Sequence, residues 1–239
     1  MNSNNSKIIV LSLEEAHTRR NHMIKMLHDI ELYNYEFFNA VNGKNLELVS
    51  VFNNRIHLVK DPQYKRNYFY DSMKRINNQG LGLGELGCSI SHLMIYEKLV
   101  NDNSCDMYLI LEDDCMPNVS KELIHKFLTN LPSHHLFDFA HICLSDWYPF
   151  EKEFNLNAYY YIPKRNFFNR MTAFVITKEG ARKLLENNRL IGYPCDDNAS
   201  SLHVFANHFR VIVPEHTLFR HNENFESHTL KINRGEMIN

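Results

Sequence analysis

Short apolar segments recur along the chain, and segments with helical spacing lie between them. The apolar segments lie at residues 7–13, 35–41, 107–111, 139–144, 159–162, 172–176 and 209–213. Apolar residues at helical spacing, or helix-capping residues, mark residues 13–32, 88–100, 120–131 and 178–187. Strands that alternate with helices are typical of an α/β layer. The sequence therefore predicts an α/β fold with a mostly parallel sheet flanked by helices.

Length and charge narrow the class of protein. A chain of 239 residues with 44% hydrophobic content can bury one substantial core, so we expect a single domain over residues 1–239. The formal net charge of -2 predicts no field that would attract nucleic acid. The apolar run near the start is too short for a secretion signal or a membrane helix, so we expect a soluble, cytoplasmic protein. The oligomeric state stays open.

The five cysteines are widely spaced and form no CxxC pair. Neither a disulfide framework nor a structural zinc site is indicated, and we expect free, buried thiols. Ser12 and Glu15 have the spacing of a capping box that would begin the first helix. Thr177 is a candidate N-cap for the helix at residues 178–187.

Residues 45–80 carry basic and aromatic residues without a regular pattern. Long loops are usually functional or mobile, so this segment is a candidate lid or acceptor-side insertion, with a passive insertion as the alternative. The glycine cluster GLGLGELG follows at residues 80–87. Because no strand precedes it and no Gly-Lys-Ser/Thr follows, it is neither a dinucleotide fingerprint nor a Walker loop. Its glycines instead predict a close backbone approach to a ligand or to another helix.

Glu112, Asp113 and Asp114 directly follow the most apolar segment, residues 107–111. In open α/β sheets, ligands bind at the carboxyl ends of strands. Glu112 and Asp114 are one residue apart and can point the same way, and magnesium and manganese take carboxylate oxygens. A cation held there would bridge two phosphates. The alternative is that three acids simply close a strand at the surface.

Five sequence blocks together resemble glycosyltransferase family 25, the lipooligosaccharide galactosyltransferase family that also includes collagen galactosyltransferases. LILEDDCMP looks like the acidic DXD-type motif of GT-A glycosyltransferases. The other blocks, in the family's order, are IIVLSLEEAHTRR, FFNAVNG, GELGCSISH and AFVITKEGARKLL. The resemblance covers most of the chain apart from residues 45–80 and the C-terminal end.

The resemblance implies a GT-A type, Rossmann-like nucleotide-sugar-binding fold. It further implies a UDP-sugar donor, most often UDP-galactose, and Mn²⁺ or Mg²⁺ as the cofactor. The sugar would pass with inversion to a lipooligosaccharide or other glycan hydroxyl, which gives a β-linkage. A lipid-linked acceptor would bring the protein into peripheral contact with the inner face of the inner membrane.

The resemblance also implies a set of donor-binding residues at the ends of the first two strands and in the later blocks. These residues are Leu11, Ser12, Leu13, Arg19, Arg20, Ala40, Val41, Asn42, Glu85, His92 and Asp113. Family members usually carry Asp where this chain has Asn42, so one ribose or base contact differs. Arg19 and Arg20 are adjacent and cannot share a helix face, so we expect one to contact phosphate and the other to face solvent. His92 would contact phosphate or orient Glu85, with a structural histidine as the alternative.

Inverting transfer requires a general base that takes the proton of the acceptor hydroxyl. Asp196 and Asp197, in YPCDDN, match the family's late Pro-x-Asp element. We favour Asp196 over Asp197 as the base, and the alternative is that both acids cap the following helix. Glu112 and Asp114 are the predicted metal ligands, completed by His221, although the family more often carries Gln near that position.

Two other classes of protein are alternatives to this assignment. A metal-dependent phosphodiesterase or hydrolase would need a second cluster of ligands, and Asp138 and His141 have the wrong spacing for one. A non-catalytic carbohydrate-binding module would use exposed aromatic residues such as Trp147, Tyr148 and residues 159–161. Such a module has no need of the acidic triplet, so the glycosyltransferase is favoured.

Overall fold

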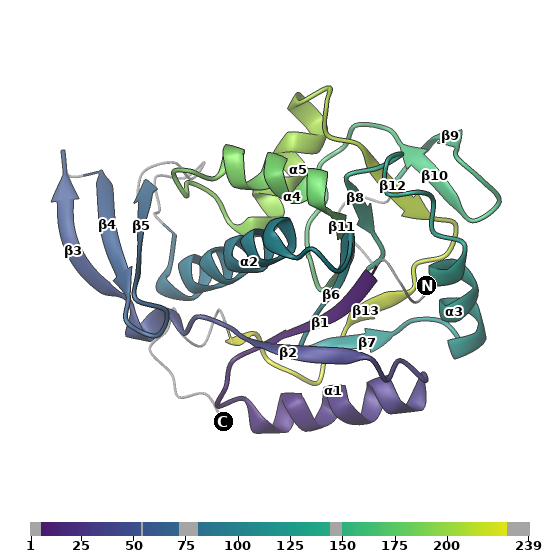
Figure 1. Cartoon of the computed structure of the whole chain (residues 1–239), viewed down its shortest axis with the longest axis horizontal. Helices are drawn as coiled ribbons and strands as arrows, with labels where there is room; N and C mark the ends of the chain where they lie inside the picture. Colours follow the sequence, from purple (N-terminus) through teal and green to yellow (C-terminus); the bar gives the residue numbers. More distant parts are fainter. Residues whose placement is uncertain (1–5, 54, 72–80, 144–149, 229–239) are drawn as a thin grey trace.

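The computed structural model describes residues 6–53, 55–71, 81–143 and 150–228, and its centre is an eight-stranded sheet (Figure 1). The strand order is β2-β1-β6-β11-β8-β12-β10-β9. The strands are β1 Ser6–Ser12, β2 Tyr35–Asn39, β6 Met107–Glu112, β8 Phe139–His141, β9 Lys152–Asn155, β10 Tyr160–Pro163, β11 Ala173–Thr177 and β12 Val211–Pro214.

Most strands of this sheet point the same way. β1 is parallel to both β2 and β6, and β8 is parallel to β12. β11 is antiparallel to β6 and β8, and β10 is antiparallel to β12 and β9. Only β10 and β11 are therefore reversed, which leaves six of the eight strands in one direction. The predicted α/β fold with a mostly parallel sheet flanked by helices is confirmed.

Helices cover both faces of the sheet because its strands are apolar on both sides. Ile8 and Val10 of β1 pack in one core with residues of α1 and α3, whereas Ile9 and Leu11 pack in a second core with α2, α4 and α5. Figure 1 shows α1 on one side of the sheet and α2, α4 and α5 on the other. The helices are α1 His17–Asp29, α2 Leu83–Asn101, α3 Lys121–Thr129, α4 Lys178–Asn187 and α5 Cys195–Phe205.

The two predicted helix starts have different outcomes. Thr177 caps α4 as predicted, since its Oγ1 accepts a hydrogen bond from the Gly180 backbone N–H at 3.1 Å. The prediction of a capping box at Ser12 and Glu15 is wrong. Ser12 is the last residue of β1, and α1 begins only at His17, after Ala16, with no side-chain cap. The Ser12 hydroxyl is used elsewhere, as described below.

Residues 47–71 form a separate antiparallel sheet that the sequence pattern did not reveal. Its strands are β3 Glu47–Phe52, β4 Ile56–Asp61 and β5 Arg66–Asp71. β3 has consecutive exposed apolar residues, Leu48 and Val49, so the period-two alternation of a strand is lost. β5 is joined to the main body by backbone hydrogen bonds between Asp71 and Ile191 (2.8 Å) and between Ile191 and Phe69 (3.0 Å). Residues 72–80 lie outside the described residues.

Two glycines allow α2 to approach the exit of β2. A Cβ atom at Gly87 would lie 2.7 Å from the Val41 carbonyl oxygen, and one at Gly43 would lie 1.8 Å from the Leu83 carbonyl oxygen. Gly43 belongs to the short helix η1 Gly43–Asn45. The glycine block therefore serves the predicted close backbone approach, and it fixes Val41 against α2. No helix in the described part of the chain is long and apolar enough to cross a membrane.

Candidate functional site

The carboxyl ends of β1, β2 and β6 meet at a pocket of about 140 Å³. The predicted donor-binding residues that line it are Leu11, Ser12, Leu13, Arg19, Ala40, Val41 and Asp113. Glu112 and Asp114, the predicted metal ligands, line it as well. The sequence analysis missed Gly84, Cys88, Ser91, Ser227 and His228, which complete the lining. We call this cavity the first pocket.

Asp113 connects two other residues that line the first pocket, Ser12 and Arg19. Its Oδ2 accepts a hydrogen bond from the Ser12 hydroxyl at 2.6 Å, and its Oδ1 pairs with Nη1 of Arg19 at 2.7 Å. All three side chains are buried. Burial raises the pKa of Asp113, and the charge of Arg19 opposes that rise. Both carboxylate oxygens are therefore already engaged, so Asp113 links β1, α1 and β6 at the site.

Asp114 is only partly satisfied by its neighbours. Its Oδ2 lies 3.1 Å from Nη1 of Arg19 and 3.5 Å from Nδ1 of His221. Its Oδ1 is buried and has no hydrogen-bond partner among the described residues. Burial alone would raise the pKa of Asp114, but the His221 hydrogen bond and the Arg19 charge outweigh it and lower the pKa. Asp114 thus keeps one carboxylate oxygen without a hydrogen-bond partner in the described chain.

A small two-stranded sheet brings His221 to this acid. β13 Phe219–His221 pairs antiparallel with β7 Cys115–Pro117, and the register sets His221 opposite Cys115, next to Asp114. The Asn222 backbone N–H also donates to the Asp114 carbonyl oxygen at 2.7 Å. Two further histidines lie near the C-terminal end of the chain. His228 lines the first pocket, whereas His216 packs on Phe127.

Glu112 faces a different partner from Asp114. Its Oε1 lies 3.5 Å from Nε2 of His92, and its side chain keeps 24% of its exposure. Burial, with the nearby charges of Cys88 and Asp114, raises the pKa of Glu112 well above its usual range. Asp114 and His221 therefore lie side by side, while the Glu112 carboxylate turns toward α2. The open oxygen of Asp114 and the oxygen and nitrogen donors around it suit a hard divalent cation.

A second, larger pocket of about 550 Å³ adjoins the first. Glu112, Asp114, Cys88 and Ser227 line both cavities, so the two pockets meet at the acidic residues. The predicted residues Glu85, Asp196, Asp197 and His221 all line this second pocket. The sequence analysis missed Arg170, Met171, Thr172, Pro194 and Cys195 of its lining.

Asp196 and Asp197 lie in the first turn of α5, but their settings differ. The Asp196 Oδ2 accepts a hydrogen bond from the Arg170 backbone N–H at 3.1 Å, and its Oδ1 accepts one from the Asp197 N–H at 3.0 Å. Arg170 adopts a left-handed backbone conformation, with φ of 62°, which is uncommon for a residue other than glycine. Asp196 is half-buried and held in place, whereas Asp197 is exposed.

Four predicted donor-binding residues do not line the first pocket in the structure. Arg20 donates from Nε to the Leu13 carbonyl oxygen at 2.9 Å and from Nη2 to the Ser12 carbonyl oxygen at 3.1 Å, so it braces the end of β1. The expectation that one of the paired arginines faces solvent is wrong, because Arg19 is buried and Arg20 is partly buried. Asn42 bonds to Glu15 at the turn after β2.

The other two residues belong to α2. The Glu85 Oε2 accepts a hydrogen bond from the Gly82 backbone N–H at 2.8 Å, and Glu85 lines the second pocket. His92 is fully buried and contacts Cys88 and Glu112. Of the aromatic residues considered for a carbohydrate-binding module, Tyr160 and Tyr161 are buried in the core. Trp147 and Tyr148 lie outside the described residues.

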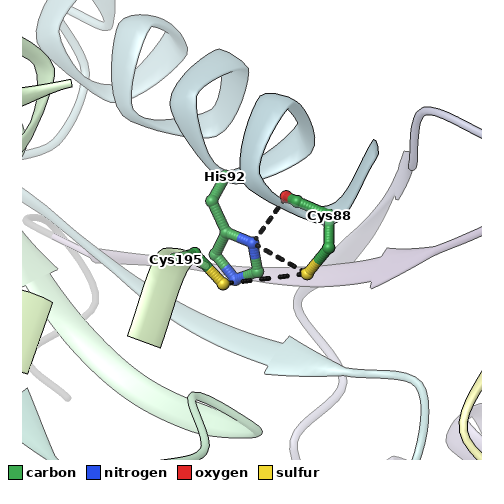
Figure 2. Close-up of side chains that lie close together, drawn as sticks. All are labelled: Cys88, His92 and Cys195. Atoms are coloured by element: carbon green, nitrogen blue, oxygen red, sulfur yellow. Dashed lines mark hydrogen bonds between the residues drawn. The ribbon is translucent and has the colours of Figure 1, made fainter. Parts of the chain in front are cut away.

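Two cysteines that we expected to be free, buried thiols meet at the site, where both are free but only partly buried (Figure 2). The Sγ atoms of Cys88 and Cys195 are 3.7 Å apart, and Cys88 Sγ is 3.7 Å from Nδ1 of His92. The contact with Cys195 and the charge of His92 lower the pKa of Cys88. Burial alone would lower the pKa of His92, but the charges of Cys88 and Glu112 raise it to about 9. The spacing of Cys88 and His92, four residues apart on a helix, was the available signal.

Comparison with known proteins gives a consistent answer. The family model described as "Glycosyltransferase family 25 (LPS biosynthesis protein)" matches residues 5–199. A putative glycosyltransferase R655 of Acanthamoeba polyphaga mimivirus is 30% identical over 135 residues, which are 54% of this chain and 35% of that protein. Procollagen galactosyltransferase 2 of Homo sapiens is 23% identical over 184 residues, 76% of this chain and 28% of that protein.

The chain thus spans about a third of the length of these two relatives. Among solved structures, a glycosyltransferase involved in the glycosylation of the major capsid of PBCV-1 aligns with 97% of this chain and 98% of its own. That alignment has a TM-score of 0.41 and 10% sequence identity.

Proposed function

Because the chain belongs to glycosyltransferase family 25, we propose that it transfers a hexose from a UDP-sugar to the hydroxyl of a glycan acceptor. The observation that carries this proposal is the pair of adjoining pockets, which share Glu112 and Asp114. A transferase must hold a donor and an acceptor on either side of one reacting carbon. Two cavities that meet at carboxylates suited to a metal would provide that arrangement.

The first pocket is the proposed donor site. It lies where ligands bind in open α/β sheets, at the carboxyl ends of β1, β2 and β6. The backbone of Leu11, Leu13 and Val41 would cradle the uridine. Arg20 and Asn42 would support the donor site indirectly, because they fix the turns after β1 and β2 by hydrogen bonds. Asp113 would do so by its ion pair with Arg19.

Asp114 and His221 would hold Mn²⁺ or Mg²⁺, and Glu112 would join them by turning from His92. The open Oδ1 of Asp114 supports this assignment. The cation, when bound, supplies positive charge to the departing diphosphate. Arg19, 3.1 Å from Asp114, adds a fixed positive charge beside the same acids.

The second pocket is the proposed acceptor site. Asp196 would take the proton from the acceptor hydroxyl, on the side of the sugar opposite the diphosphate, so that the new linkage is inverted to β. Its hydrogen bond from the Arg170 backbone fixes the carboxylate toward the pocket that it lines. Asp197 is the second candidate for this role, since it lines the same pocket.

Galactose and a lipooligosaccharide or lipopolysaccharide core are the proposed sugar and acceptor. The family description names LPS biosynthesis, and the human relative is named a galactosyltransferase. An acceptor with a lipid anchor would bring the protein to the inner face of the membrane. We place the reaction within one domain, residues 1–239, with residues 45–80 on the acceptor side.

A calorimetric donor screen tests the proposal. UDP-galactose, UDP-glucose and UDP-N-acetylhexosamines are titrated into the protein with and without Mn²⁺. We expect UDP-galactose to bind most tightly, and only with the metal. Asp114→Asn should no longer bind UDP-galactose in the presence of Mn²⁺. Glu122→Gln, a change in an exposed acid of α3, should bind it as the unchanged protein does. If none of the UDP-sugars binds, the proposed function is wrong.

A further inference from the structure

We propose that Cys88, His92 and Cys195 form a second metal site, one that binds a thiophilic divalent cation such as Zn²⁺ and joins α2 to α5. One ligand atom from each of these residues lies within 4.8 Å of the other two. Cys88 and His92 come from α2, and Cys195 is the first residue of α5 (Figure 2). The donor set differs in kind from the oxygen-rich set around Asp114, so the two sites select different cations.

The distance between the sulfur atoms fits tetrahedral zinc. Zn–S bonds of about 2.3 Å at a tetrahedral angle place two sulfur ligands about 3.8 Å apart. Cys88 Sγ and Cys195 Sγ are 3.7 Å apart, so a cation can be held without moving either side chain far. A disulfide bond would require the sulfurs to approach to about 2.05 Å. The present geometry therefore favours a bridging cation over a covalent link.

His92 offers a buried nitrogen that has no hydrogen-bond partner in the described part of the chain. Its Nδ1 lies 3.0 Å from the Cys88 carbonyl oxygen, which can only accept, so Nδ1 donates a proton there. Its Nε2 is buried, has no hydrogen-bond partner among the described residues and lies 3.5 Å from Glu112 Oε1. Coordination through Nε2 keeps the Nδ1 bond to the backbone, the arrangement in which metal-binding histidines are usually oriented.

The cluster lies where a bound cation would fix the position of α5 relative to α2. Cys88 lines both pockets, and Cys195 directly precedes Asp196. Cys195 contacts α2 through the Sγ atom of Cys88. A cation held by both sulfurs would therefore fix the start of α5, and with it Asp196, against α2.

Cobalt provides a spectroscopic test, because thiolate ligands give Co²⁺ an intense near-ultraviolet charge-transfer band. The full chain is reduced with a phosphine and titrated with Co²⁺ and then with Zn²⁺. We expect one equivalent of Co²⁺ to produce this band with the visible bands of a tetrahedral ion, and Zn²⁺ to abolish them. Zn²⁺ should also raise the thermal unfolding temperature.

Cys195→Ser and Cys195→Ala should each lose the charge-transfer band, with circular dichroism verifying the fold of both variants. Cys105→Ser is the matched control, since Cys105 is a buried thiol next to Asp102 and outside the cluster, and it should keep the band. Asp114→Asn should keep it as well, which separates this site from the proposed donor metal. The proposal is overturned if the reduced protein gives no thiolate band, or if Cys195→Ala gives the same band as the unchanged protein.

Discussion

Two buried acid–cation clusters lie at the two ends of the strands of the central sheet, which we call its amino edge and its carboxyl edge. Asp138 directly precedes β8, at the amino edge, and Asp114 follows β6, at the carboxyl edge. The Asp138 Oδ1 pairs with Arg210 at 2.9 Å, and its Oδ2 accepts from the Arg210 backbone N–H at 2.7 Å and from Lys183 at 2.9 Å. Asp114 has Arg19 and His221 on one oxygen and no partner in the described chain on the other.

The difference separates a structural acid from one that can bind a ligand. A buried carboxylate whose oxygens are all paired within the protein stabilises the fold and has nothing left to offer. A buried carboxylate with an open oxygen carries a desolvation cost that a bound cation can recover. We therefore expect changes at the carboxyl edge to affect turnover and changes at Asp138 to affect stability.

The largest effect is expected at Asp196. Asp196→Asn removes the proposed general base, so transfer should fall by about 10²–10⁴-fold. The affinity for UDP-sugar should be unchanged, because the base acts on the acceptor, and stability should change little. Single-turnover transfer and calorimetry measure the two quantities. Asp197→Asn is the matched control, and our assignment of the base is wrong if that variant shows the loss instead.

Asp114→Asn should lower turnover by about 10²–10³-fold, since a lost ligand weakens stabilisation of the leaving diphosphate. Glu112→Gln should behave similarly. Arg19 keeps Asp113 as a partner, so the unfolding temperature should remain close to that of the unchanged protein. Steady-state rates across a range of Mn²⁺ concentrations provide the test. If both variants are fully active at saturating Mn²⁺, neither Asp114 nor Glu112 is a metal ligand.

Asp138→Asn should show the opposite profile. The substitution leaves Lys183 and Arg210 without their buried counter-charge, so we expect a loss of about 3 kcal/mol in the free energy of unfolding. The folded fraction should retain its transfer rate, because Asp138 lies at the far edge of the sheet. Urea unfolding and rates at low temperature measure these effects. A drop in the specific rate of the folded enzyme would contradict the structural assignment of this cluster.

The same variant should change the pH dependence of stability. Burial alone would raise the pKa of Asp138, but the bonds from Arg210 and Lys183 outweigh it and lower the pKa. A lowered pKa in the folded state contributes stability above the unfolded value of about 3.9, and this contribution is lost as pH falls through the folded value. The Asn variant should therefore lose less stability than the unchanged protein on acidification below about pH 5. Equal acid sensitivity would show that other groups dominate.

The sequence predicted the main sheet and the position of the acidic triplet from local patterns, and the rest of the first pocket from the family resemblance. Apolar strands are visible as short runs, and parallel strands bring their carboxyl ends to one edge. Ser12, Arg19 and Asp113 became donor-binding candidates through the resemblance to glycosyltransferase family 25, without knowledge of their contacts. Their mutual bonds were not predictable, since Arg19 and Asp113 are 94 residues apart in the chain.

What the sequence missed depends on contacts between distant segments. Cys88 and Cys195 are separated by 107 residues, and neither position alone indicates a pair. Arg20 was read as a surface or phosphate residue, whereas it braces the Leu13 carbonyl group. The sheet of β3, β4 and β5 escaped notice because β3 and much of β5 are exposed and carry apolar residues on both faces.

The smallest expected effect concerns this second sheet and the proposed acceptor-side segment, residues 45–80. Lys65 lies at the turn between β4 and β5, with φ of 56°, and Arg66 pairs with Glu97 of α2. If the segment closes over a bound donor, UDP with Mn²⁺ should slow tryptic cleavage after Lys65 by a few fold. The same hypothesis predicts slower cleavage after Lys74 and Arg75, and these two residues lie outside the described residues.

Glu97→Gln sharpens this test, because it weakens the exposed pair that ties Arg66 to α2. Cleavage after Lys65 should then be faster without ligand, and UDP with Mn²⁺ should restore part of the protection. Asp114→Asn should show no protection at all, since protection requires the metal-bound donor. Equal cleavage of the unchanged protein with and without ligand would mean that residues 45–80 are a passive insertion. The acceptor would then depend on the second pocket alone, where Asp196 and Arg170 lie.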